Sequence, residues 1–360
     1  EELVVSTRNS ADEKFDKGTA LPKPFNAGQN YGGVSISLNN KELYLCACEE
    51  VNNYNNCDIF VSNYEYKPNE KSGKYEYHWS ELRNLGDAIN SESTWEAQPS
   101  ISADGKTLYF ATSRPTSEGI DIYYSEKQED GTWSRAKSMG SVINTPGNDK
   151  APFMHTDSRT MYFASQISGD RRGAGDYDIF FSKQDDNGQW SEPKNLGYPI
   201  NSSQAEDGLI VNITGSTAYF SSGRIKNGAG GKDIYSFELP NEAKPEKVVL
   251  MKGNLSNEKG EPINEAKLSL NYDDKSKNKE IDIITDDGSF AIAVNMEKDE
   301  KVIVTLEKEK TAYQSRLIKE SDAKGGVVKN KNIEIKTLKT GQSFDIKDIV
   351  FATNSSDLDE

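Results

Sequence analysis

Three carboxylates recur at one position of a repeated stretch and are the first candidates for chemistry. Glu96, Asp149 and Glu206 each lie the same distance before a tyrosine, and Tyr31 holds that place earlier in the chain. Carboxylates that converge at the mouth of a channel could hold a cation or a basic peptide. The alternative is that each accepts hydrogen bonds from its own turn. The sequence favours the turn role and leaves the binding role open.

A second set of acids opens an Asp-Ile-aromatic string that occurs once per repeat. Because the members are related by the repeat, we expect them to lie far apart and to accept backbone N–H groups of adjoining loops. The tryptophans of the repeat are expected to pack between its strands. The two sets are Asp58, Asp121, Asp178 and Asp233, and Trp79, Trp133 and Trp190.

The remaining residue types argue against metal or acid–base catalysis. The chain has two histidines, His78 and His155, and they stand alone, so neither a zinc site nor a cofactor is predicted. Cys46 takes the place of small residues in other repeats and is predicted to be buried and inert. Cys48 and Cys57 flank one hairpin loop and are predicted to form a disulfide, which would require an oxidising compartment.

The elements that position these residues are set by an internal repeat. A phrase of the form Trp-Ser, then Leu-Gly or Met-Gly, then Ile-Asn begins at Trp79, Trp133 and Trp190. Tyrosine strings and the Asp-Ile strings precede it, with turn residues such as Asp104-Gly105 between them. Four short strands in about 55 residues is the content of a propeller blade. The prediction is an all-β chain with a β-propeller over residues 1–240.

The ends of the array bear on the number of blades. Residues 3–8 match residues 109–114, so the chain is expected to open inside a blade that lacks its first strand. One partial unit and four clear ones predict five blades, or six if further sequence precedes Glu1. Arg8, Arg114 and Arg224 share one strand end, where an arginine could bind an anionic partner; pairing with the blade's own Asp is the simpler expectation.

The repeat resembles the PD40 type of WD40-like propeller repeat, since its three strings recur together in order. A charged linker is expected at 241–248. Residues 249–340 alternate short strands with Gly turns and resemble the carboxypeptidase regulatory-like domain, which implies a transthyretin-like β-sandwich. The resemblance rests on Gly253, the Gly260-Glu-Pro262 turn, Ala266, the Asp287-Gly288 turn before Phe290, and the string that begins at Tyr313.

Residues 341–360 resemble the opening strand and helix start of the OmpA C-terminal domain. In that domain an Asp and an Arg further along bind peptidoglycan, and neither is assigned here. The order of domains resembles multidomain OmpA-family envelope lipoproteins of Bacteroidetes, among them a component of the type IX secretion system. The resemblance implies a periplasmic protein associated with the outer membrane, with envelope or secretion-system proteins as partners and peptidoglycan reached only through the OmpA-like domain.

Composition agrees with this class of partner. The net charge is −15, and an acidic surface repels phosphate, so nucleic acid is a poor partner. No apolar run approaches the roughly 20 residues of a transmembrane helix. A tyrosine-rich insertion, residues 64–77, is peculiar to one repeat and is predicted to be either a contact patch or merely an extended hairpin.

Three functions remain in view. The first is a non-catalytic periplasmic scaffold. The second is a propeller glycosidase, because the Asp186-Asn-Gly188-Gln-Trp190 string resembles the Asp-box turn of sialidases. Glycoside hydrolysis requires a carboxylate pair at a defined separation, which the sequence cannot identify among 58 acids. The third is a propeller that binds sugar or peptide alone.

Overall fold

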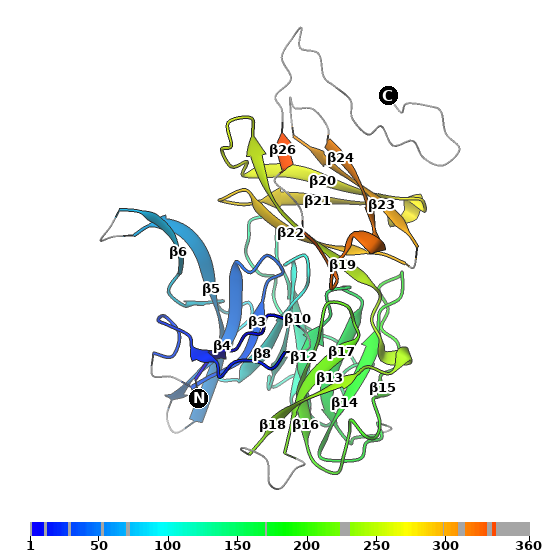
Figure 1. Ribbon diagram of the computed structural model, residues 1–360. Helices are drawn as coiled ribbons and strands as arrows, with labels where there is room; N and C mark the ends of the chain where they lie inside the picture. Colours follow the sequence, from blue (N-terminus) through cyan, green and yellow to red (C-terminus); the bar gives the residue numbers. More distant parts are fainter. Residues whose placement is uncertain are drawn as a thin grey trace. The chain divides into compact units, whose positions relative to one another are not determined.

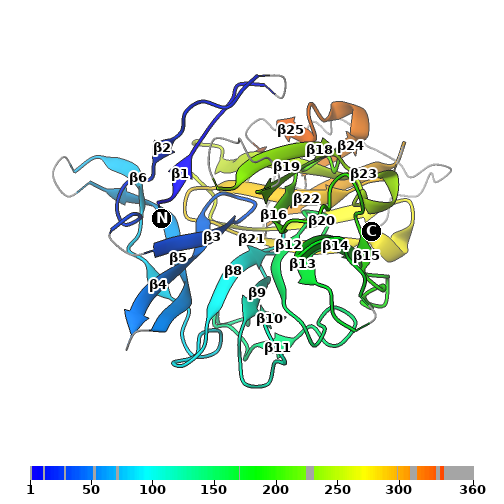
Figure 2. The same cartoon turned by 90° about the horizontal axis from the view of Figure 1, so that it is seen from below.

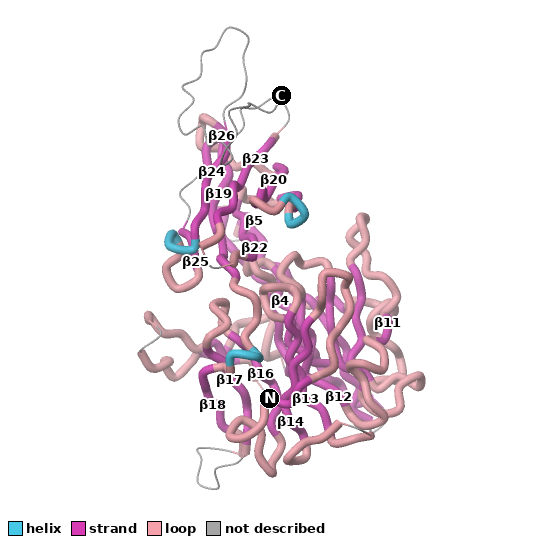
Figure 3. The backbone as a smooth tube through the Cα atoms, turned by 90° about the vertical axis from the view of Figure 1, so that its right-hand side faces the viewer, coloured by secondary structure: helices cyan, strands magenta, loops and turns pink. Residues whose placement is uncertain are grey.

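Short antiparallel sheets make up almost all of the secondary structure in the computed structural model of the chain (Figures 1 and 3). The structure describes residues 2–10, 13–27, 30–51, 54–69, 73–169, 171–223, 231–297, 299–308, 314–329 and 333–335. Contacts divide the chain into two units, residues 1–246 and 247–360. The segment expected to begin an OmpA-like domain, 341–360, lies outside the described residues, as do Arg224 and Tyr313.

The described residues of unit 1 form five antiparallel sheets, which we call blades 1 to 5. Blade 1 has β1 (Val4–Val5) and β2 (Thr19–Ala20). Blade 2 has β3 (Asn30–Ile36), β4 (Glu42–Val51), β5 (Tyr54–Pro68), β6 (Tyr75–Trp79) and β7 (Arg83–Asn84). Blade 3 has β8 (Glu96–Ile101), β9 (Thr107–Thr112), β10 (Asp121–Glu126) and β11 (Lys137–Ser138). Blade 4 has β12 (Asp149–Met154), β13 (Thr160–Gln166), β14 (Tyr177–Lys183) and β15 (Lys194–Asn195). Blade 5 has β16 (Glu206–Val211), β17 (Thr217–Ser222) and β18 (Asp233–Glu238).

This arrangement confirms the predicted β-propeller in its broad form. The first strands of blades 2 to 5 follow one another around a centre, with β3 beside β8, β8 beside β12 and β12 beside β16. Figure 2 shows β8 and β12 nearer this centre than the outer strands β11 and β15. Each blade buries its faces only against its neighbours, which is why the repeat is needed.

Every inner strand of blades 2 to 5 carries a bulge at the same position. The backbone there is left-handed, with φ of 46° at Gly33, 55° at Gln98, 50° at Ala151 and 63° at Gly208. The Gln98 side-chain carbonyl accepts a hydrogen bond from the Ala151 N–H at 2.9 Å. A β-carbon on Gly33 would lie 2.7 Å from Cα of Gln98, so a side chain is excluded there. The bulges of blades 2 and 3 are therefore in contact, as are those of blades 3 and 4.

Hydrophobic clusters fill the interfaces between consecutive blades. Blades 2 and 3 share a cluster that includes Tyr44 and Leu108, and Trp133 packs on Tyr44 with ring centroids 6.2 Å apart. Blades 3 and 4 share Ile122, Met161 and their neighbours, with Trp190 against them. The predicted packing role of the tryptophans is what the structure shows at these two positions and at Trp79, which packs on Phe25 at 5.5 Å.

The stretch expected as a linker, 241–248, does not form one free segment. Its first part is a short 3₁₀ helix, η1 (Asn241–Ala243), and Ala243 is fully buried. The Tyr162 hydroxyl donates to the Ala243 carbonyl, and the Glu246 N–H donates to Asp157. Residues 241–246 thus belong to unit 1, because these buried partners hold them on blade 4, and β19 begins at Val248.

Unit 2 contains two four-stranded sheets. One joins β19 (Val248–Asn257), β22 (Ser289–Asn295), β25 (Val327–Lys329) and β26 (Ile333–Ile335). The other joins β20 (Glu265–Tyr272), β21 (Lys279–Ile284), β23 (Lys301–Glu307) and β24 (Gln314–Lys319). The helical turns η2 (Lys275–Lys277) and η3 (Glu320–Asp322) connect strands. Alternate residues of both sheets, among them Val249, Phe290, Leu268 and Val302, share one hydrophobic cluster.

Candidate functional site

The three recurring carboxylates are buried and serve their own blades. Glu96 is fully buried and accepts hydrogen bonds from the hydroxyls of Thr94 and Thr112, both at 2.6 Å, and from the Ser91 N–H at 3.1 Å. Arg114 lies 3.4 Å away and also donates to the Ile89 carbonyl. Glu96 therefore links the turn before blade 3 to the end of β9.

Asp149 and Glu206 repeat this arrangement in blades 4 and 5. Asp149 accepts from the N–H and hydroxyl of Thr145 and pairs with Arg171 at 2.8 Å. Burial raises the pKa of Asp149, and hydrogen bonds and the Arg171 charge oppose the rise. Glu206 accepts from Ser202 and from the Ser222 hydroxyl at 2.8 Å. Tyr31, at the same position of blade 2, is also buried.

The contacts of all three carboxylates are those of the turn role, which the sequence favoured over a ring of binding carboxylates at a channel mouth. A carboxylate that is fully buried and accepts three or more hydrogen bonds has little capacity left for a cation. Of the hollows lined by described residues of unit 1, two have volumes of about 440 Å³ and 580 Å³, and none of the three acids lines either of these. Among the described residues, no three His, Cys, Asp or Glu side chains gather closely enough to hold a metal ion.

Arg171 is a residue that the sequence pattern did not identify. It comes from the loop after β13, where the repeat offers no arginine at the strand end, and its guanidinium reaches Asp149 and the carbonyls of Val142 and Ile143. Arg114 makes the equivalent contacts in blade 3. The partner of the strand-end arginine is therefore the inner-strand acid, not the acid of the Asp-Ile string.

The acids of the Asp-Ile strings differ from blade to blade. Asp178 accepts from the N–H groups of Ala174 and Gly175 and from Asn195, as predicted for this set. Asp58 accepts from the Asn84 side chain at 2.7 Å. One buried oxygen of Asp121 has no hydrogen-bond partner, and burial together with the nearby charges of Asp149 and Glu118 raises the pKa of Asp121. Asp233, at the same position of blade 5, is half-buried.

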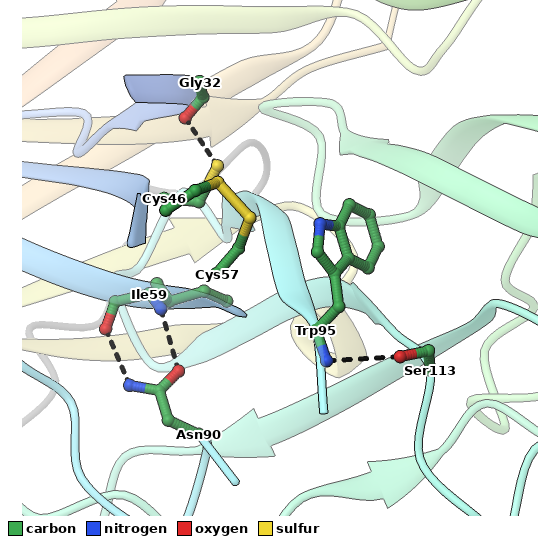
Figure 4. Close-up of a disulfide and its surroundings, with 8 residues drawn as sticks. Gly32, Cys46, Cys57, Ile59, Asn90, Trp95 and Ser113 are labelled. Atoms are coloured by element: carbon green, nitrogen blue, oxygen red, sulfur yellow. Dashed lines mark hydrogen bonds between the residues drawn. A yellow bond between two sulfur atoms is a disulfide. The ribbon is translucent and has the colours of Figure 1, made fainter. Parts of the chain in front are cut away.

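Cys48 and Cys57 form a disulfide across the β4–β5 pair, with an S–S distance of 2.05 Å. Cys46 is buried and free, and its Sγ lies 3.0 Å from the Gly32 carbonyl (Figure 4). In the same region the Asn90 side chain exchanges two hydrogen bonds with the backbone of Ile59. Asn144 and Asn201 do the same to Ile122 and Ile179, which explains the Asn of the Ile-Asn phrase.

The tyrosine-rich insertion forms a hairpin in which β5 continues past β4 to pair with β6 (Figure 1). Residues on one face alternate along both strands, so their rings stack in a continuous series. Ring centroids are 4.9 Å apart for Tyr64 and Tyr77, for Tyr64 and Trp79 and for Tyr66 and Tyr77, and 5.4 Å for Tyr66 and Tyr75. We call Tyr64, Tyr66, Tyr75, Tyr77 and Trp79 the aromatic ladder.

The ladder is an exposed apolar surface. Tyr75 is 61% exposed, Tyr66 44% and Tyr77 37%. Lys41 Nζ lies 4.2 Å from the centroid of Tyr77, the middle ring of the ladder. The opposite face of the hairpin is charged, with an ion pair between Lys67 and Glu65 and a contact of 3.4 Å between His78 and Glu76. His78 therefore belongs to the charged face and not to the ladder.

His155 is an internal structural residue. It is fully buried, its Nε2 lies 3.1 Å from the Asn212 carbonyl, and its Nδ1 accepts from the Asp157 N–H. These contacts join blade 4 to blade 5. None of the helices in the described part of the chain is long and apolar enough to cross a membrane.

No protein-family model matches the sequence, and no curated protein is similar to it at a significant level. Solved structures that are similar in fold include the GH43 endo-arabinanase from Bacillus licheniformis, at 15% identity over 57% of this chain and 71% of that chain, with a TM-score of 0.33. The native arabinanase of Bacillus subtilis is similar at 17% identity over 63% and 83%, with a TM-score of 0.38. The propeller domain of the Trilobed protease from Pyrococcus furiosus is similar at 14% identity over 87% and 84%, with a TM-score of 0.30. Identities this low say nothing of what this chain binds.

Proposed function

We propose that this chain is a non-catalytic scaffold that recruits a partner protein through the aromatic ladder. The observation that carries the proposal is the ladder itself, five stacked rings on one face of a hairpin, three of them exposed. A two-stranded hairpin is marginally stable in water unless its apolar face is covered. Exposed apolar patches of this kind mark interaction sites, and tyrosine and tryptophan are enriched among the residues that dominate binding energy.

The inner-strand carboxylates support the non-catalytic part of the proposal. Each accepts hydrogen bonds from hydroxyl and N–H donors, and Glu96 and Asp149 also pair with an arginine, so these carboxylates are engaged in structural contacts. A pair of free carboxylates at a hydrolytic spacing is what a glycosidase needs.

We further propose that the scaffold works in the periplasm at the outer membrane. The Cys48–Cys57 disulfide supports an oxidising compartment, since such bonds are rare in the cytosol. The sequence resemblances support a PD40-type propeller, a regulatory-like sandwich and an OmpA-like segment that tethers a secretion or envelope complex to peptidoglycan. The two sheets of unit 2, with their shared core, are of the size that such a sandwich requires.

Site-specific cross-linking tests the ladder. A photo-activatable phenylalanine analogue at Tyr75 should cross-link to a discrete partner in envelope extract, and Tyr66→Ser should abolish that product. Tyr198, which is 90% exposed on blade 4, is the matched control position. Equal cross-linking from positions 75 and 198, or a product unaffected by Tyr66→Ser, would contradict the proposal.

A further inference from the structure

The hollow of about 440 Å³ in unit 1 lies between blades 3 and 4 and is within the size range of small-molecule sites. Both blades have four strands, so the hollow does not arise at an end of the repeat array. Its aromatic walls are half-buried, and its two acids are exposed at the rim. The residues that line it include Asp104, Tyr109, Tyr124, Glu126, Met139 and Trp190.

The tyrosine of the Tyr string shows how this interface differs from its neighbours. The Tyr44 hydroxyl donates to Glu42 at 3.1 Å, and the Tyr162 hydroxyl donates to the Ala243 carbonyl. The Tyr109 hydroxyl has no hydrogen-bond partner within the part of the chain that the structure describes. It lines the hollow instead.

Between blades 2 and 3, a lysine occupies the equivalent place. Lys127 Nζ lies 3.1 Å from the Glu42 carboxylate and 5.6 Å from the centroid of the Trp133 ring. The repeat places Gln184 at the position of Lys127 and Thr107 at the position of Glu42. Gln184 donates to a carbonyl of its own turn, at 2.8 Å. These two neutral side chains cannot form the ion pair that spans the interface between blades 2 and 3.

Between blades 4 and 5, residues 241–246 occupy the equivalent place. Asp157, at the position of Asp104, accepts a hydrogen bond from a backbone N–H of this segment at 2.9 Å. Lys183, at the position of Glu126, donates to one of its carbonyls at 2.7 Å. A lysine thus matches a carbonyl at this position, and the carboxylate of Glu126 favours a cationic occupant between blades 3 and 4.

The electrostatics of the hollow also favour a cation. Burial, followed by the negative charge of Asp104, raises the pKa of the Tyr109 hydroxyl well above its usual range. Lys137 pairs with Glu126 at 3.1 Å, but both side chains are more than half exposed, so this pair contributes little. Aromatic faces attract cations, and three aromatic rings line the hollow.

We propose that this hollow binds a primary ammonium group on an alkyl chain, as carried by a lysine side chain of a polypeptide or by a free diamine. In this arrangement the alkyl chain packs on the aromatic rings, and the ammonium donates to Asp104, Glu126 and the Tyr109 hydroxyl. The ligand takes the place that Lys127 fills between blades 2 and 3. The site is separate from the aromatic ladder, so its failure would leave the proposed function untouched.

Titration of the full, isotope-labelled chain with Nα-acetyl-lysine N-methylamide tests the inference. The readout is the indole N–H resonance of Trp190, assigned with Trp190→Phe. We expect this resonance to shift with saturation, and the indole resonance of Trp133 to stay in place because Lys127 already fills that interface. Cadaverine forms a second arm. Tighter binding of the lysine amide identifies a polypeptide as the source of the ammonium, and tighter binding of cadaverine identifies a free diamine.

Two control ligands separate a primary ammonium from other groups. The Nε-acetylated form of the same lysine amide has no charge, and choline has a charge but no N–H donor. Neither should shift the Trp190 resonance.

Substitutions at the rim should move the affinity in opposite directions. Glu126→Gln should weaken binding about threefold, as expected for the loss of an exposed ion pair. Glu129→Gln, in the exposed turn after β10, is the matched control and should bind like the parent chain. Lys137→Gln should strengthen binding about twofold, because it removes the cation that competes for Glu126.

A double variant should close the hollow from within. Thr107→Glu together with Gln184→Lys reproduces the Glu42–Lys127 pair and should abolish binding. Its urea midpoint of unfolding should be no lower than that of the parent chain, which separates a filled site from a misfolded one. The inference is overturned if this folded variant still binds, or if the parent chain shows no saturable shift. It is also overturned if either control ligand binds as well as the lysine amide, or if Glu129→Gln weakens binding as much as Glu126→Gln.

Discussion

The interface between blades 3 and 4 and the junction around blade 1 are built from the same repeat, yet they differ in what the repeat achieves. In the first, Ile122 is fully buried, Trp190 packs on the cluster and Arg171 ties blade 4 to the carbonyls before it. In the second, the equivalent isoleucine, Ile234, is exposed, and Arg8 donates to the Tyr219 hydroxyl and lies over the Phe15 ring. The comparison teaches that a blade is stable through its neighbours rather than through its own sequence.

The largest difference is expected for the arginines. Arg171→Gln should lower the free energy of unfolding of unit 1 by about 3–5 kcal/mol, because it leaves the buried Asp149 carboxylate without its charge partner. Arg8→Gln should cost less than about 1 kcal/mol, as expected for a half-exposed contact with an aromatic ring. Urea unfolding followed by tryptophan fluorescence measures both. The exposed Arg172, changed to Gln, is the control, and an equal loss for Arg171 and Arg172 would contradict the buried pairing.

Truncating the isoleucine of the Asp-Ile string compares the packing contribution of a buried and an exposed member of the same set, Ile122 and Ile234. Ile122→Ala should cost about 3 kcal/mol, since it opens a cavity in a filled cluster. Ile234→Ala should change the free energy of unfolding by less than about 0.5 kcal/mol, because the side chain is exposed. A loss at Ile234 as large as that at Ile122 would show that the junction is closed in solution.

The Cys48–Cys57 disulfide allows the stability of blade 2, which lies next to blade 1, to be tested separately. Reduction should lower the free energy of unfolding by about 2–3 kcal/mol, the expected effect of releasing a short closed loop. Urea midpoints with and without reductant give the value. A chain with Cys48→Ala and Cys57→Ala should be insensitive to reductant, and a remaining response would point to Cys46 instead.

The smallest change in stability is expected for two acids of the Asp-Ile strings, Asp121 in blade 3 and Asp178 in blade 4, and its sign should differ between them. Asp121 has a raised pKa and a buried oxygen without a partner, so the stability it contributes is present below its unfolded pKa and is lost as the pH rises through the folded value. Asp121→Asn should therefore stabilise unit 1 at pH 7, and the effect should fall toward zero as the pH is lowered to about 3. Asp178→Asn should instead destabilise by about 1 kcal/mol, because Asp178 accepts two backbone N–H groups. Thermal unfolding at both pH values decides, and the same sign for both variants would contradict this account.

The sequence was sufficient to predict the blades because strand strings and turn residues recur in one order. The Tyr and Asp-Ile strings fall on β9, β10, β13, β14, β17 and β18 as expected, and the Ile-Asn phrase acquires a reason in the hydrogen bonds that Asn144 makes to Ile122. These features follow from local alternation and turn chemistry, which a single sequence displays.

The candidate site was harder to predict because burial and loop contacts are not periodic. Arg171 comes from a loop of its own blade, so no repeat position indicated it. Gln98 and Ala151 adopt a left-handed backbone that sequence rules reserve mainly for glycine, and only their contact with neighbouring blades explains it. Whether the Glu96 side chain faces solvent or its own turn also depends on how neighbouring blades pack, which the sequence of one repeat does not display.

Blades 1 and 5 meet through Arg8 and Phe15 at Tyr219, whereas large buried clusters join blades 2 to 5 to one another. Stability in such an array passes from neighbour to neighbour, so opening starts at the ends and moves inward. Amide hydrogens of blade 5 and of the β1 strand should then exchange soonest, and those of β9 and β13 last.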